Sequence, residues 1–146
     1  MDLNSSEKER YTRQMIIADW GKAGQQRIKN STVFIAGAGG LGSPVAVYLA
    51  VAGIGTLRIC DYGEPELSNL NRQILHSESD IGINKAISAE ASIKLLNPNV
   101  RVVPITEMIT EDTVEGIVGN AEIIVDCLDN FEARHILNEF AFNFTS

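Results

Sequence analysis

A glycine-rich turn between an apolar run and a helix-forming stretch constrains this chain more than any other feature of its sequence. Residues 32–36 form a short, continuously apolar run, which is typical of a parallel strand buried on both faces. The turn that follows is Gly-Ala-Gly-Gly-Leu-Gly over residues 37–42, and residues 41–52 are rich in alanine, valine and leucine. A strand, a glycine turn and a helix in this order predict the start of a Rossmann-like βαβ unit.

Strand-like and helix-like segments go on alternating along the chain. This alternation predicts an α/β fold in which helices flank a parallel sheet. Strands are expected from short apolar runs, and helices from longer segments with capping residues at their starts and glycine or Asn-Pro at their ends. The expected strands cover residues 32–36, 56–61, 100–105 and 122–126, and the expected helices residues 41–52, 83–96, 110–119 and 131–142.

The first thirty residues are expected to form a helical arm in front of the sheet. Ser6 and Glu9 fit a capping box at the start of a helix. Trp20 is expected to pack this helix onto the sheet. Residues 31–146 would then form the Rossmann-like core, and the length of the chain gives no reason to expect a second domain.

The glycine turn also predicts a nucleotide site. Gly37, Gly39 and Gly42 fit the pattern G-x-G-x-x-G, in which glycines let the backbone approach a phosphate and a helix N-terminus presents free N–H groups to it. Asp61 follows the first glycine by 24 residues, at the end of the next strand. Its carboxylate can accept hydrogen bonds from ribose hydroxyls. The alternative interpretation is a glycine turn kept for packing alone.

Charged residues beyond Asp61 favour ATP over a dinucleotide. Arg72 lies in a polar connection, Lys85 near the start of the next helix, and Asp129 just after the fourth strand. Nucleotidyl transfer needs cations that neutralise charge on the phosphates and a carboxylate that can hold Mg²⁺. Hydride transfer does not, so an NAD(P)- or FAD-dependent oxidoreductase is an alternative that leaves Arg72 and Lys85 unexplained.

Several short motifs follow one another from about Arg10 to the end of the chain. They are Arg10-Tyr11-x-Arg13-Gln14, the turn at 37–42, Asp61, Ser68-Asn69-Leu70-x-Arg72-Gln73, Ile81-Gly82-x-x-Lys85 and Asp126-Cys127-x-Asp129-Asn130. In order and spacing this set resembles the ThiF/MoeB/HesA family, a branch of the ubiquitin-activating enzyme superfamily.

The resemblance implies an adenylyltransferase. Such an enzyme activates the C-terminal Gly-Gly carboxylate of a ubiquitin-like sulfur-carrier protein, of the thiamine or molybdopterin type, by letting that carboxylate attack the α-phosphate of ATP. The resemblance therefore implies ATP and Mg²⁺ as cofactors, the carrier as partner, and a homodimer. No side-chain nucleophile is needed, because catalysis consists of positioning and charge stabilisation.

The same resemblance assigns roles to residues of this chain. It implies catalytic roles for Arg13, Asn69, Arg72, Lys85 and Asp129. Arg13 would reach into the partner subunit's site, and Asp129 would hold Mg²⁺ together with ATP. Nucleotide contacts are implied for Gly37, Gly39, Gly40, Leu41, Gly42, Asp61, Ser68, Asn69, Asn71, Arg72, Gln73, Lys85, Asp129 and Asn130.

The chain also departs from the family pattern. Family members usually continue well beyond the point that corresponds to Ser146, with cysteine pairs that hold structural zinc in many of them, and no such ligands occur here. We expect ATP binding to survive without the later half of the family fold, while turnover stays open. Two further alternatives are an ATP-dependent tRNA-modifying dehydratase of the same superfamily and a non-catalytic nucleotide-binding module.

Composition narrows the class of protein further. The net charge of −7, without a basic run, argues against nucleic acid as the primary ligand. No apolar run approaches the ~20 residues that span a bilayer, and the polar start does not resemble a signal peptide, so a cytoplasmic protein is expected. Cys60 and Cys127 are expected to pack as small apolar residues, and His76 to form hydrogen bonds in its loop.

Overall fold

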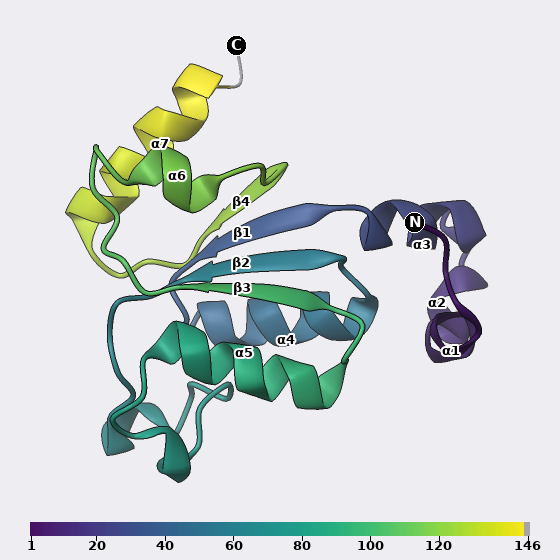
Figure 1. Ribbon diagram of the computed structural model, residues 1–146, viewed down its shortest axis with the longest axis horizontal. Helices are drawn as coiled ribbons and strands as arrows, with labels where there is room; N and C mark the ends of the chain where they lie inside the picture. The colour runs from purple at the N-terminus through teal and green to yellow at the C-terminus, as the bar shows by residue number, and fades with distance from the viewer. Residues whose placement is uncertain (145–146) are drawn as a thin grey trace.

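The chain folds around a parallel sheet, which confirms the predicted α/β Rossmann-like class (Figure 1). The computed structural model describes residues 1–144. The sheet has the strand order β3-β2-β1-β4, so the strand before the glycine turn lies inside it. The strands are β1 (Thr32–Ala36), β2 (Thr56–Cys60), β3 (Arg101–Ile105) and β4 (Ile123–Asp126).

All four strands end at the same level. Ala36 at the end of β1 pairs with Cys60 of β2 on one side and with Asp126 of β4 on the other, and Cys60 pairs in turn with Ile105 of β3. The residues that follow the four strands therefore meet at one edge of the sheet, where ligands of open α/β sheets bind.

Two helical layers cover the sheet (Figure 1). The helices α4 (Gly42–Ala52) and α5 (Lys85–Leu96) lie on one face, and α6 (Val114–Val118) and α7 (Phe131–Phe144) on the other. Between β2 and α5 runs a loop that contains two short 3₁₀ helices, η1 (Leu67–Asn69) and η2 (Glu78–Asp80).

Alternate residues of β1 pack into two apolar clusters, one on each face of the sheet. Val33 and Ile35 belong to the apolar cluster under α4 and α5, whereas Phe34 and Ala36 belong to the cluster with α6 and α7. All four are at most 2% exposed. This two-sided burial confirms the expectation drawn from the apolar run, because a central strand has no polar face.

Two helices begin later than the predicted residues 83 and 110. Helix α5 begins at Lys85, since the Asn84 side chain accepts the N–H groups of Ala86 and Ile87. Helix α6 begins after Thr113, and Thr110 instead forms a turn that leads into it.

The N-terminal arm consists of three helices rather than the single helix that was expected: α1 (Ser5–Arg10), α2 (Thr12–Met15) and α3 (Gly21–Lys29). The capping box is formed by Asn4 and Glu7, so the prediction of Ser6 and Glu9 was wrong by two residues. The Asn4 side chain accepts the Glu7 N–H at 2.8 Å, and the Glu7 carboxylate accepts the Asn4 N–H at 3.1 Å.

The arm is held against the C-terminal end of α4. The buried Tyr11 hydroxyl accepts a hydrogen bond from Asn97 Nδ2 at 2.8 Å, and Gln25 Nε2 donates to the Ala52 carbonyl at 2.8 Å. Trp20 donates its indole N–H to Gln25 Oε1 at 3.0 Å, within the arm itself. The docking role that was expected of Trp20 is therefore performed by Tyr11 and Gln25.

Gly53 ends α4 in the left-handed conformation, with φ +98°, directly under the arm. A Cβ there would lie 2.6 Å from Tyr11 Cζ and 2.6 Å from Gln25 Nε2, so both a backbone constraint and close packing require glycine. No helix in residues 1–144 has the length and apolar character needed to cross a membrane.

Gly53→Ala separates these two effects when it is compared with Gly82→Ala. Gly82 has a similar φ of +91° but open space around its Cα. We expect Gly82→Ala to lower the free energy of unfolding by about 1–2 kcal/mol, the cost of a left-handed residue that carries a Cβ. Gly53→Ala should lower it by about 3 kcal/mol or more, because overpacking adds to that cost. Equal losses in denaturant unfolding would contradict the packing of the arm.

Candidate functional site

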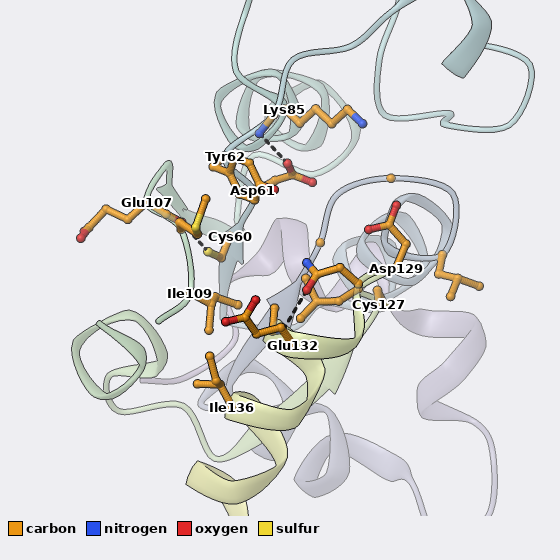
Figure 2. A pocket seen from close by; sticks show the side chains of 18 of the residues that line it. Cys60, Asp61, Tyr62, Lys85, Glu107, Ile109, Cys127, Asp129, Glu132 and Ile136 are labelled. Carbon is orange, nitrogen blue, oxygen red and sulfur yellow. Dashed lines mark hydrogen bonds between the residues drawn. The ribbon is translucent and has the colours of Figure 1, made fainter. Parts of the chain in front are cut away.

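A cavity of about 1190 Å³ opens at the carboxyl edge of the sheet (Figure 2). This volume exceeds what a nucleotide needs, since pockets for ligands of that size are roughly 300–1,000 Å³. Most of the nucleotide-binding residues predicted from the sequence line it: Gly37, Gly39, Gly40, Leu41, Asp61, Arg72, Gln73, Lys85, Asp129 and Asn130.

Close packing fixes the shape of the glycine turn. Gly37 has φ +98°, and a Cβ there would lie 2.7 Å from the Cys127 carbonyl oxygen, just after β4. A Cβ at Gly42 would lie 1.9 Å from the Gly37 carbonyl oxygen. Gly42 is buried and lies outside the cavity lining, so the structure places it as a support of the turn.

The backbone amides of this turn are available to a ligand. The Ser43 N–H donates to the Gly39 carbonyl at 2.9 Å and starts the hydrogen bonding of α4. Within residues 1–144, the N–H groups of residues 39–42 have no protein acceptor. Free N–H groups at the start of an eleven-residue helix can bind an anion.

Asp61 follows β2 and contacts the glycine turn at Ala38. Its Oδ2 accepts the Ala38 N–H at 2.9 Å, and its Oδ1 accepts the Gly63 N–H at 2.8 Å. A carboxylate oxygen can accept more than one hydrogen bond. Asp61 therefore holds the turn and still has acceptor capacity for hydroxyl groups in the cavity.

Two cations border the cavity. Among the side chains that the structure describes, none forms an ion pair with Arg72 or Lys85. The Arg72 guanidinium donates instead to Asn71 Oδ1 at 3.0 Å and to the Ser68 carbonyl at 3.3 Å. Lys85 is the first residue of α5, where the helix dipole disfavours a positive charge. Unpaired cations at this edge of an acidic chain indicate an anionic ligand.

Besides Gly42, four predicted residues lie outside the cavity lining: Arg13, Ser68, Asn69 and Asn71. Asn69 Oδ1 accepts the Glu66 N–H at 2.9 Å and caps η1, and Asn71 supports Arg72. Arg13 is exposed on α2 in the arm, which lies at the amino end of the sheet, opposite the cavity (Figure 1).

The other half of the cavity was not predicted as part of the site. Its residues come from the segment after β3 and from the start of α7, including Glu107, Ile109, Glu132 and Ile136 (Figure 2). The rule that parallel strands place their following residues at one edge would have found Glu107 to Ile109, because they follow β3. The contribution of α7 depends on its angle to the sheet, which periodicity does not show.

The two cysteines lie within the cavity wall as neutral thiols. Burial, together with the nearby carboxylates of Asp61 and Glu107, raises the pKa of Cys60 to about 12. Its Sγ lies 3.3 Å from the Glu107 carbonyl oxygen, to which it donates. Burial and Asp126 also raise the pKa of Cys127. Within residues 1–144 no three His, Cys, Asp or Glu side chains are grouped so that they could hold a metal ion.

Residues 11–145 match the ThiF family. This chain belongs to the ThiF family. Among curated ThiF-type relatives, it is 47% identical to "Adenylyltransferase and sulfurtransferase MOCS3" of Dictyostelium discoideum, over 94% of this chain and 32% of that protein. It is 40% identical to the "SAMP-activating enzyme E1" of Haloferax volcanii, over 95% of this chain and 52% of that protein. The chain thus spans about half or less of the length of these relatives.

Solved structures share the fold of this chain. The crystal structure of PaaA is 37% identical, with a TM-score of 0.85 over 97% of this chain and 46% of that one. The E. coli tRNA N6-threonylcarbamoyladenosine dehydratase in complex with ATP superposes with a TM-score of 0.91, over 98% of this chain and 58% of that one. At 24% identity, this second likeness shows the fold alone.

The raised pKa values predict slow alkylation of both cysteines. Thiolates are the nucleophiles, and a thiol with a pKa of about 12 is almost fully protonated at pH 8. We expect iodoacetamide at pH 8 to leave Cys60 unmodified in the folded protein and to label it after unfolding in urea. Mass spectrometry of the peptides measures the labelling of Cys60 in the folded and in the unfolded protein. Rapid labelling of Cys60 in the folded protein would contradict its burial and protonation.

Proposed function

We propose that this chain forms the ATP site of an adenylyltransferase that activates the C-terminal Gly-Gly carboxylate of a ubiquitin-like sulfur-carrier protein. One observation carries the proposal: residues 39–41, whose amides have no protein acceptor in residues 1–144, line the same cavity as Asp61 and the unpaired cations Arg72 and Lys85. A dinucleotide enzyme needs the turn and the carboxylate, but hydride transfer itself does not require the two cations.

The names of the relatives support this choice. MOCS3 is an adenylyltransferase and sulfurtransferase, and the enzyme of Haloferax volcanii activates SAMP. A structural neighbour has been solved with ATP bound. Because the chain spans only part of these proteins, the transfer of their activity and partners to it is part of the proposal.

In the proposed complex the nucleotide spans both halves of the cavity. The amides of residues 39–42 bind the triphosphate, with Arg72 and Lys85 beside it, and Asp61 accepts hydrogen bonds from the ribose. The adenine lies in the half formed by the segment after β3 and by α7, against Ile109 and Ile136. Gln73 lines the cavity and is 5% exposed. Its Oε1 has no hydrogen-bond partner among the described residues, so it is free to accept a hydrogen bond from the nucleotide.

The chemistry consists of positioning and charge stabilisation. The carrier carboxylate attacks the α-phosphorus, a bond from this phosphorus to oxygen breaks, and pyrophosphate leaves with the electron pair. Arg72 and Lys85 stabilise the negative charge that grows on the leaving group. The exposed Asp129 would hold Mg²⁺ at the cavity, and the ion would supply further charge stabilisation. Ser68, Asn69, Asn71 and Asn130 would complete the contacts to the nucleotide.

We further propose that residues 1–146 act as one unit, with an arm of residues 1–30 and a core of residues 31–146, and that two copies form a homodimer. Arg13 lies outside the cavity of its own subunit, on the arm at the other end of the sheet. In a dimer it would instead reach the cavity of the partner subunit. Ile16 and Ile17 beside it are 75% and 53% exposed, which suits an apolar contact between subunits.

ATP affinity tests the nucleotide site. We expect Lys85→Ala to weaken ATP binding by about 10- to 100-fold, because a charge-assisted hydrogen bond is lost. Lys94→Ala is the matched control, since Lys94 is exposed on the same helix and lies outside the cavity lining. Calorimetry with ATP and with NAD⁺ measures both ligands. Tighter binding of NAD⁺ than of ATP, or equal effects of the two substitutions, would reject the proposed site.

A mixing experiment tests the role of Arg13 across subunits. Arg13→Ala and Lys85→Ala should each abolish ATP–pyrophosphate exchange in the presence of a carrier that ends in Gly-Gly. A mixture of the two variants should regain roughly a quarter of the sites, because one site of each mixed dimer is intact. No gain on mixing would show that Arg13 does not act in the partner's site. No exchange by the wild type would count against the adenylyl transfer itself.

A further inference from the structure

His76 is buried between the glycine turn and α5. It belongs to the loop that connects β2 with α5, yet it is only 6% exposed. Its Nε2 lies 2.7 Å from the Ala38 carbonyl oxygen, and its Nδ1 lies 2.7 Å from Ser88 Oγ. The imidazole therefore bridges the phosphate-binding turn and the helix that begins with Lys85, and it confirms the expectation that His76 forms hydrogen bonds.

The partners of the ring decide where its proton lies. A carbonyl oxygen can only accept, so Nε2 carries a proton and donates it to Ala38. In the neutral ring Nδ1 accepts from the Ser88 hydroxyl, which is 1% exposed. The bond to Ala38 is the same in the imidazolium form, because Nε2 is protonated there too. The hydrogen bond from His76 to the glycine turn is therefore present in both the neutral and the charged ring.

This bond sets the direction of a peptide group. In a trans peptide the C=O and the following N–H point in opposite directions. Because His76 holds the Ala38 carbonyl, the Gly39 N–H points away from His76 and α5. Gly39 lines the cavity, and its N–H is one of the amides without a protein acceptor in residues 1–144. The other side of Ala38 is held by Asp61, which accepts its N–H at 2.9 Å.

We propose that His76 is a positioning residue: by binding the Ala38 carbonyl, it holds the Ala38–Gly39 peptide so that the Gly39 N–H faces the phosphate position. Gly39 and Gly40 carry no side chain that would resist a rotation of this peptide, so an external bond has to fix it. A flipped peptide would present a carbonyl oxygen to the phosphate and repel it. The inference rests on the proposed nucleotide site and adds a residue outside its lining.

Two amide substitutions separate positioning from packing. The glutamine amide nitrogen reaches about as far as Nε2, so His76→Gln can keep the bond to Ala38. The asparagine nitrogen reaches only as far as Nδ1, so His76→Asn keeps a polar group near Ser88 and loses the bond to the turn. Both variants remove the ring, and a role in packing alone would therefore affect both.

We expect His76→Asn to weaken ATP binding by about tenfold and His76→Gln by at most about threefold, the range that one hydrogen bond supplies. In the absence of ATP, the Gly39 amide resonance should move in the asparagine variant and stay near its wild-type position in the glutamine variant. Equal affinities and equal Gly39 shifts in the two variants would overturn the proposal.

A measurement on the wild type keeps the proposal falsifiable if either variant unfolds. The ¹⁵N spectrum of the His76 ring should show a proton on Nε2 that is coupled through its hydrogen bond to the Ala38 carbonyl carbon. An unprotonated Nε2 would overturn the inference. If wild-type protein binds no ATP but shows this proton and the Gly39 shifts, the proposed function fails while the hold on the turn stands.

Discussion

The site depends on a close contact between two backbone segments that only glycine permits. The Gly37 carbonyl oxygen occupies the place of a Cβ at Gly42, and Gly37 itself lies against the Cys127 carbonyl. These contacts bring the start of α4 down onto the ends of β1 and β4. Residues 39–41 consequently line a cavity instead of continuing a strand. A residue with a Cβ at either glycine would push the helix away and remove the anion site.

Polar groups outside the turn complete this arrangement. Asp61 holds the N–H side of Ala38 and His76 holds its C=O side, at 2.9 and 2.7 Å. The two residues come from the end of β2 and from the long loop after it. Because Lys85 follows this loop at the start of α5, the loop fixes both the orientation of the turn and the position of a cation. These contacts explain why the loop between β2 and α5 is partly buried although it is rich in polar residues.

The fold and about half of the site could be predicted from the sequence, for identifiable reasons. Burial on both faces makes β1 apolar throughout, and its length and glycine border are visible without a structure. The carboxyl-edge rule then placed Asp61 and Asp129 correctly beside the turn. Ile109 and Ile136, in the other half of the cavity, were not predicted because the sequence does not distinguish an isoleucine in a cavity wall from one in the core. The three-helix arm escaped because its breaks arise from turns and tertiary contacts, not from periodicity.

The central claim is that the free amides of the turn, together with Arg72 and Lys85, bind the triphosphate of ATP. A crystal structure of the protein with ATP and Mg²⁺ tests this most directly. It should show phosphate oxygens within hydrogen-bond distance of the amides of residues 39–42, the ribose on Asp61, and the base against Ile109 and Ile136. A triphosphate bound elsewhere, or an adenine that occupies the turn, would contradict the account.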